Sequence, residues 1–369
     1  MREDSWKYGD QKIDEKELMF TIGSLIIGVG ILTLPRSIAK ATGSPDGWLS
    51  ILIAGCAVLI LAWLLSRLSL RFRGRPYLEY AASIASKPAA NGIAIVYASY
   101  FLMFTAYVTR SVAELSKQFL FDKTPLEVIS LAFLLVLIYA VSGSRAGLIR
   151  LTVIFLPFVL IVTSIFLLLG IKQFDYHNLM PILNTDSSKV MKGAKESIFS
   201  FLGFESVLFY SCLMRNPSKI PKFTMFAIII TIITYLLIFI AVIGIFSVEV
   251  TQNILFPTLE LAREVSVPGE FFERLESLFL IFWVVSIFTT AAISLDLTVQ
   301  STYFLFKAEK RKLMYGLTPV IYLLSMMPGN IVELGQLGLL VSNTGILTSL
   351  IIPVLLFVIV KIQEARSSG

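Results

Sequence analysis

Two glycines lie inside the first apolar run of the chain, Gly28 and Gly30 in the sequence GVGILTLP (28–35). A helix in lipid must satisfy its backbone hydrogen bonds internally, because the hydrocarbon offers no partners. Glycine weakens a helix at such a point, and Pro35 removes one donor. A break in a membrane helix is tolerated where the freed N–H and C=O groups line a cavity or meet a ligand. The sequence therefore predicts a small-molecule site near the centre of the bilayer.

The composition of the whole chain indicates a membrane protein. Of its 369 residues 56% are hydrophobic and 15% are charged, and the mean hydropathy is +0.81. These values exclude an ordinary soluble globular domain. The net charge of +6 is spread over short loops, which indicates membrane topology and argues against nucleic acid as a partner. Residues 1–17 are rich in charge, so no cleavable signal peptide is expected.

Ten apolar runs are long enough to cross the hydrocarbon core as helices. They cover residues 17–40, 47–70, 91–120, 125–142, 147–171, 193–214, 222–248, 274–304, 313–328 and 340–361. Two shorter segments, 76–86 and 256–265, are predicted to lie at the membrane interface.

Lysine and arginine favour the loops on the side of the N-terminus, whereas the loop 249–276 is rich in glutamate. Both termini are therefore expected to be cytoplasmic.

The two halves of this pattern resemble each other. Span one holds Gly28 and Gly30, and span six holds Gly203. Broken helices five spans apart predict two inverted five-helix repeats, and thus an all-α polytopic membrane protein. The predicted units are a single transmembrane domain, 1–369, with a first repeat over 17–171 and a second over 193–361. The alternative is that these are ordinary packing glycines, which are common in membrane helices.

Ionisable residues inside a span are costly and indicate function. Glu205 follows Gly203 and Phe204 near the middle of span six. Its carboxylate is suited to a ligand ammonium group or to carrying a proton. The alternative is a structural role, as an acceptor for loosened N–H groups of the same helix. Arg110 and Glu114 lie one turn apart in span three, so a mutual ion pair is the expected role.

Span eight carries hydroxyl groups close to a carboxylate, a set that suits a small cation. The cluster consists of Thr289, Thr290 and Ser294, followed by Asp296. Hydroxyls in membrane helices also bond to their own backbone, which is the alternative. Span three carries an aromatic stripe at helical spacing, and Tyr97 of this stripe and Phe201 of span six are expected to cover a ligand.

The chain has little material for catalysis. Cys56, Cys212 and His177 are too few for a metal site, and no nucleophile and base are paired in the sequence. No metal, no cofactor and no enzymatic activity are therefore expected.

The two predicted breaks have complementary chemistry. In span one the second half-helix would begin with free N–H groups and the positive end of its dipole, which suit a carboxylate. In span six the first half-helix would end in free carbonyls, which suit an ammonium group. A zwitterion such as an amino acid fits this arrangement, and a neutral polar solute is the remaining alternative.

Several motifs resemble a known family. GVGILTLP, FLGFE (201–205) and the ten-span pattern are similar to the amino acid–polyamine–organocation superfamily, whose members share a five-plus-five inverted repeat (the LeuT-like fold) with broken helices one and six. Within it the chain resembles the B subunits of bacterial spore germinant receptors. The motifs that carry this closer resemblance are DGWLSILIAG (46–55), RFRGRPYLEYA (71–81) and DKTPLEVISLAFLLVLIYA (122–140).

The resemblance implies a subunit in the inner membrane of the bacterial spore that recognises a nutrient germinant and works with an A subunit and a lipoprotein C subunit. The ligand-binding residues that it implies are Gly28, Val29, Gly30 and Ile31, with Phe201, Gly203, Phe204 and Glu205 opposite. Some proton-coupled relatives place a lysine in the fifth span, but 151–170 contains no lysine or arginine. This difference favours a sensor over a proton-coupled amino acid secondary transporter. A nutrient-gated cation channel overlaps with the sensor, and an intramembrane enzyme is the most distant alternative.

Overall fold

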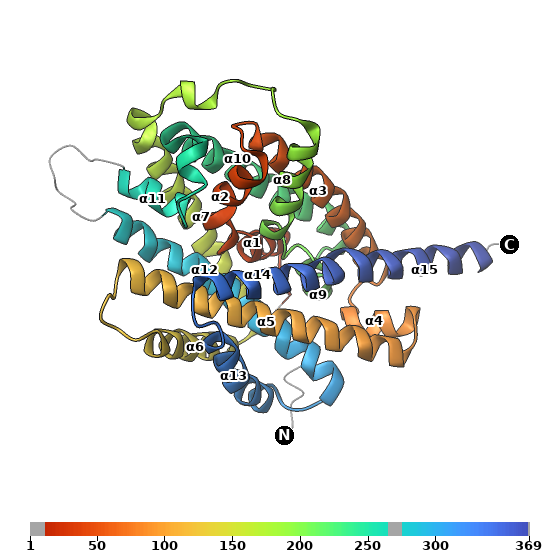
Figure 1. Cartoon of the computed structure of the whole chain (residues 1–369). Coiled ribbons are helices and arrows are strands. Elements are labelled where there is room, and N and C mark those ends of the chain that lie inside the picture. Colours follow the sequence, from red (N-terminus) through yellow and green to blue (C-terminus); the bar gives the residue numbers. More distant parts are fainter. Residues whose placement is uncertain (1–11, 265–274, 368–369) are drawn as a thin grey trace.

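The computed structural model describes residues 12–264 and 275–367, and within these ranges its regular secondary structure is helical apart from one bridge between Ile13 and Met214 (Figure 1). Part of the acidic loop at 249–276 lies outside the described residues. The first half contains α1 Glu15–Ile26, α2 Gly30–Thr42, α3 Gly47–Arg71, α4 Tyr77–Ile84, α5 Lys87–Phe119, α6 Leu126–Ser142 and α7 Arg145–Leu169. The second half contains α8 Ser187–Ser200, α9 Ser206–Tyr210, α10 Ile220–Thr251, α11 Pro257–Glu264, α12 Leu275–Phe306, α13 Lys310–Met326, α14 Ile331–Ile346, a π-helical turn Leu347–Ile351 and α15 Ile352–Ser367.

Each of the ten predicted spans coincides in position with a helix or a pair of helices. Six are long and apolar enough to cross a membrane alone, namely α3, α5, α7, α10, α12 and the continuous α14–α15. Span one is the bent pair α1 and α2, whose axes meet at 53°. The pair α8–α9 lies at the position predicted for span six, and the shorter 17-residue helices α6 and α13 lie at those predicted for spans four and nine. The predicted interfacial segments are the short helices α4 and α11.

The tenth span begins earlier than the apolar run predicted, at Ile331 and not at residue 340. Its first turns contain Glu333 and Gln336, so the apolar signal starts late. The start is defined instead by Asn330, whose side chain accepts hydrogen bonds from the N–H groups of Val332 and Glu333. A polar N-cap thus begins the helix before its hydrophobic part.

Both predicted breaks are present. In span one, residues 27–29 are not helical, and a Cβ on Gly28 would lie 2.6 Å from the Thr290 hydroxyl oxygen. In span six, Gly203 has φ +120°, a conformation that other residues rarely adopt. Pro35 lies inside α2 without ending it, because the Thr258 hydroxyl of α11 donates at 2.9 Å to the Ile31 carbonyl that proline leaves unpaired.

The helices that carry the breaks lie inside the bundle. α5 and α12 pack along each other, and α8 packs against both α2 and α3 (Figure 1). We call the end of the bundle at which α1 begins the proximal end and the opposite one the distal end. By connectivity, α4 lies at the proximal end, whereas α2 ends and α8 begins at the distal end.

Candidate functional site

The two breaks lie beside each other at the centre of the bundle. The Tyr235 hydroxyl of α10 is 3.1 Å from the carbonyl oxygen of Ile26 and 2.6 Å from that of Ser200. The Ser200 hydroxyl in turn lies 3.4 Å from the Gly30 carbonyl. The residues that end α1 and α8 and the residue that begins α2 therefore meet within a few ångströms.

The freed carbonyls of span one are already satisfied by side chains from other helices. The Trp283 indole donates to Gly28 at 3.3 Å, and the Ser286 hydroxyl donates to Ile27 at 2.6 Å. One turn earlier, the Thr290 hydroxyl of α12 donates to the Ser24 carbonyl at 2.7 Å. Acceptors at this break are thus engaged by the protein itself.

The N–H groups at the start of α2 are different. Those of Val29, Gly30 and Ile31 make no hydrogen bond to any residue in the described part of the chain, and no side chain caps this helix. An uncapped helix start presents donors and the positive end of the helix dipole together. This half of the break is chemically suited to an anionic group such as a carboxylate.

A small cavity of about 10 Å³ lies between the breaks. It is lined by Leu25, Ile26, Gly28, Val29, Gly30, Phe104, Tyr107, Phe199, Ser200, Leu202 and Val341. This volume admits about one water molecule. In this conformation the space between the breaks is filled by the protein's own large side chains.

Of the residues singled out from the sequence, Gly28, Val29 and Gly30 line this cavity. Those that do not line it are Ile31, Tyr97, Phe201, Gly203, Phe204 and Glu205. Tyr107 and Phe199 do line it and were not singled out. Because Tyr107 is three residues after Phe104, continuing the aromatic stripe toward the distal end would have found it.

Two of the aromatic residues expected to cover a ligand have other contacts. The Tyr97 hydroxyl donates at 2.5 Å to the Thr348 carbonyl, in the π-helical turn of span ten, and lies 3.2 Å from the Tyr77 hydroxyl. The Phe201 ring packs on the Tyr235 ring with centroids 5.0 Å apart. Tyr97 therefore joins span three to span ten, and Phe201 packs on the tyrosine that bonds both breaks.

Glu205 is fully buried directly after the break in span six. Its Oε2 accepts a hydrogen bond from the Gly203 N–H at 2.9 Å. Its Oε1 has no partner of good hydrogen-bond geometry within the described residues, and the polar side chain that lies near this carboxylate is the Tyr100 hydroxyl. The carboxylate thus satisfies one loosened backbone donor and keeps a second oxygen for another partner.

The hydroxyl cluster of span eight is divided between two neighbouring helices. Thr289 hydrogen-bonds the Ser24 hydroxyl of α1 at 2.6 Å, whereas Ser294 donates to the Phe101 carbonyl of α5 at 2.9 Å. Thr290 also bonds Ser24, through its carbonyl, so Thr289 and Thr290 meet at one residue of α1 while Ser294 is engaged with α5. In the described part of the chain no three His, Cys, Asp or Glu side chains are grouped for a metal ion.

Two ion pairs lie within the bundle. Arg110 and Glu114 pair at 2.8 Å, which confirms the expected ion pair in span three. The buried Asp296 carboxylate lies 3.5 Å from the Arg145 guanidinium at the start of α7 and accepts a hydrogen bond from the Tyr210 hydroxyl at 2.9 Å. Arg145 also lines a second cavity of about 270 Å³ at the proximal end, next to α4.

Comparison with solved structures identifies the architecture. The fold matches MhsT in complex with L-phenylalanine with a TM-score of 0.63 at 12% identity, over 95% of this chain and 99% of that one. It matches a Na⁺-coupled sialic acid symporter in a substrate-bound outward-open state with a TM-score of 0.64 at 13% identity, over 94% and 81%. These are LeuT-fold transporters, so the predicted fold class is confirmed. The repeat boundaries 17–171 and 193–361 stay predictions.

Comparison of sequences identifies the family. The chain is 34% identical to the spore germination protein GerLB of Bacillus cereus over 99% of this chain and 98% of the relative. It is 31% identical to YndE of Bacillus subtilis (strain 168) over 95% and 96%, and 30% identical to spore germination protein A2 of the same organism over 78% and 79%. Residues 12–334 match the family described as "Spore germination protein". This multi-pass membrane protein therefore belongs to the spore germination protein (spore permease) family.

Proposed function

We propose that this chain is a germinant-sensing subunit of a spore germination receptor that binds an amino acid or a similar small solute between the broken spans one and six. The main evidence for a ligand site is that the consecutive N–H groups of Val29, Gly30 and Ile31 have no hydrogen-bond acceptor among the described residues. Glycine at 28 and 30 lets a solute approach this backbone closely. The carboxylate of an amino acid is the ligand group that these donors suit best.

The proposal requires the central space to expand. A cavity of about 10 Å³ holds no amino acid, so Phe104, Tyr107, Phe199 and Leu202 must move apart when a ligand enters. A ligand that binds only the expanded conformation shifts the population toward it, by no more than its difference in affinity for the two states. Such a shift is the signal that a receptor subunit would pass to its partners.

The family supports the setting of this proposal. We place the chain in the inner membrane of the spore, with both termini cytoplasmic. Its proposed partners are an A subunit and a lipoprotein C subunit, since its relatives include B. subtilis spore germination proteins A2 and B2. Its proposed role is that of a receptor and not of an enzyme.

A proton-coupled amino acid transporter is the second candidate. The observation that favours it is Glu205, a buried carboxylate with one unpaired oxygen beside the break in span six. A carboxylate that exchanges a proton during transport is needed for uptake, whereas one that only accepts from Gly203 is replaceable by glutamine, whose amide oxygen also accepts.

One experiment tests both candidates. The purified full chain is reconstituted in liposomes, and binding and uptake of each labelled L-amino acid are measured with and without an imposed proton gradient. Binding without accumulation, retained in Glu205→Gln, is the result expected of a sensor. Concentrative uptake that Glu205→Gln abolishes would establish the transporter instead. Absence of binding for every amino acid would contradict the proposed ligand class.

A further inference from the structure

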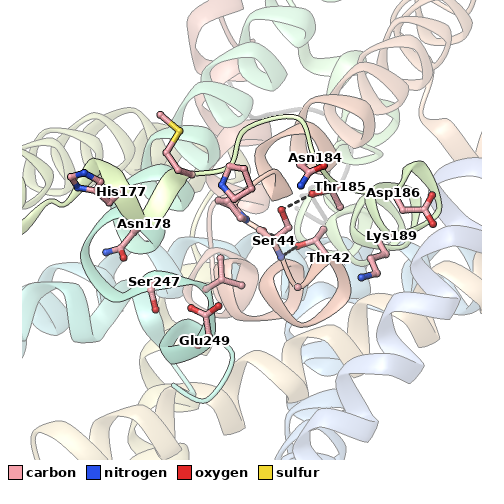
Figure 2. Close-up of a pocket in the computed structure, with 15 residues that line it drawn as sticks. Thr42, Ser44, His177, Asn178, Asn184, Thr185, Asp186, Lys189, Ser247 and Glu249 are labelled. Carbon is pink, nitrogen blue, oxygen red and sulfur yellow. Dashed lines mark hydrogen bonds between the residues drawn. The ribbon is translucent and has the colours of Figure 1, made fainter.

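A larger cavity, of about 390 Å³, lies at the distal end of the bundle (Figure 2). It is formed where α2 ends, where α8 begins, where α10 is interrupted, and beneath the segment between α7 and α8. It shares no lining residue with the small cavity between the breaks. At about 30 Å³ for each water molecule, it has room for roughly a dozen waters, and so for an amino acid.

A strained residue forms one wall of this distal pocket. Ser247, inside α10, has φ 63° and ψ 170°, a conformation that is essentially restricted to glycine. The interruption frees the Gly244 carbonyl, which accepts from the Asp175 N–H at 2.9 Å and from the Asn178 side-chain amide at 3.0 Å. Strained residues cluster at functional sites, where the surrounding structure holds them in place.

The opposite wall is fixed by Asp46, the buried residue that precedes α3. Its carboxylate accepts from the N–H groups of Leu183, Asn184 and Thr185 at 2.7, 2.9 and 3.1 Å, and from the Thr185 hydroxyl at 2.6 Å. The segment over the pocket is therefore held at both sides by specific hydrogen bonds. The walls of the pocket are therefore fixed by hydrogen bonds of the fold, and the pocket is open to solvent.

The charged groups of the lining are not equivalent. The Asp186 carboxylate accepts hydrogen bonds from Ser188, and His177 is bonded to Asp175. The Lys189 ammonium and the Glu249 carboxylate have no ion pair or side-chain hydrogen bond within the described residues. Figure 2 shows Lys189 beside Thr42, and Glu249 farther away, on the side of Ser247. The Lys189 ammonium, which interacts with the Asp186 carboxylate beyond ion-pair distance, and the Glu249 carboxylate thus place one positive and one negative charge at the border of the same cavity.

We propose that the distal pocket binds a zwitterionic amino acid, with its carboxylate toward Lys189 and its ammonium group toward Glu249. The Asn184 amide and the Ser247 hydroxyl, which also line the pocket, are placed to contact a polar side chain of the ligand. This site is separate from the one proposed between the broken helices and does not depend on it. It would add a second place at which the chain responds to the same class of solute.

The test uses the purified full chain in lipid nanodiscs and equilibrium dialysis with each of the standard L-amino acids at low ionic strength. Lys189→Gln and Glu249→Gln are each expected to weaken binding of the amino acid about threefold to fivefold, as for a partly exposed charge contact. The double variant Lys189→Glu/Glu249→Lys, which exchanges the two charges, is expected to recover most of the loss. Lys192→Gln, one turn further along α8 and outside the lining, is the matched control and should bind as the unmodified chain does.

Gly30→Val separates the two proposed sites, because it alters the break in span one and leaves the distal lining intact. Binding that survives Gly30→Val but weakens in both charge variants supports the distal site. Binding that Gly30→Val abolishes and that neither charge variant changes overturns the distal site and leaves the central one standing. If Lys192→Gln weakens binding as much as Lys189→Gln does, the effect comes from surface charge in general, and the distal site is overturned. Absence of binding for every amino acid overturns the distal site as well.

Discussion

The hydroxyl of Tyr235 lies 2.6 Å from the carbonyl oxygen of Ser200, the last residue of α8. The same hydroxyl is 3.1 Å from the carbonyl of Ile26, the last residue of α1. One fully buried side chain of α10 therefore joins the ends of the two half-helices that terminate at the centre of the bundle.

Tyr235→Phe should destabilise the protein by about 1–3 kcal/mol, because it leaves buried carbonyls without their donor. The measurement is the thermal unfolding of the purified chain in detergent or nanodiscs. Tyr139→Phe is the matched control, since Tyr139 is 82% exposed and its loss of a hydroxyl should leave the melting temperature unchanged. If Tyr235→Phe, Tyr139→Phe and the unmodified chain have the same melting temperature, the hydrogen bonds of the Tyr235 hydroxyl to the two breaks do not stabilise the protein.

Gly28→Val should abolish amino acid binding at the central site while the protein remains in the membrane. A Cβ at this position would lie 2.6 Å from the Thr290 hydroxyl oxygen, which itself bonds the Ser24 carbonyl, so the break must shift. Gly203→Leu should act in the same way, because φ +120° strains any residue with a side chain. In Gly335→Val, the control, the added group meets no atom within 4 Å. Normal ligand binding in Gly28→Val and Gly203→Leu would remove the central site from consideration.

The Asp46 anchor predicts a pH dependence of stability. Burial opposes ionisation, but hydrogen bonds from Thr185, Leu183 and Asn184 outweigh it and hold the pKa of Asp46 below its ordinary value. The folded pKa is thus lower than the unfolded one, so this contribution is present above about pH 4 and is lost as the pH falls through the folded pKa. Asp46→Asn should therefore melt earlier than the unmodified chain at neutral pH, and the two curves should approach each other in acid. A difference that stays constant across this range would show that the charge of Asp46 does not matter.

The ion pair between Arg145 and Asp296 should be asymmetric in its response to substitution. Arg145→Gln leaves a buried carboxylate without its cation and should cost about 3–5 kcal/mol. Arg145→Gln/Asp296→Asn removes both charges and should recover most of this loss, as measured by thermal unfolding. If the double variant is as unstable as Arg145→Gln alone, the damage lies in lost packing and not in an uncompensated charge.

The breaks could be predicted because their causes are local. A run such as GVGILTLP weakens a helix by its own residues, and the length of each apolar run decides whether it crosses a bilayer. The tenth span shows where this reasoning stops: its start at Ile331 depends on the Asn330 cap, which an apolar pattern does not register. The role of Phe201 and Tyr97 in covering a ligand stays a prediction, since a helical stripe does not show which of its turns faces the other break.

The sequence by itself therefore determined a polytopic helical membrane protein with interruptions in spans one and six, since hydrophobic length and glycine placement act within one segment of chain. Only the tertiary structure decided that Trp283 and Ser286 satisfy the carbonyls at the first interruption, that Thr258 satisfies the carbonyl left unpaired by Pro35, and that the donors at Val29, Gly30 and Ile31 remain free. These partners come from helices more than 200 residues further along the chain, and which atoms meet depends on how those helices cross. No local pattern encodes that crossing.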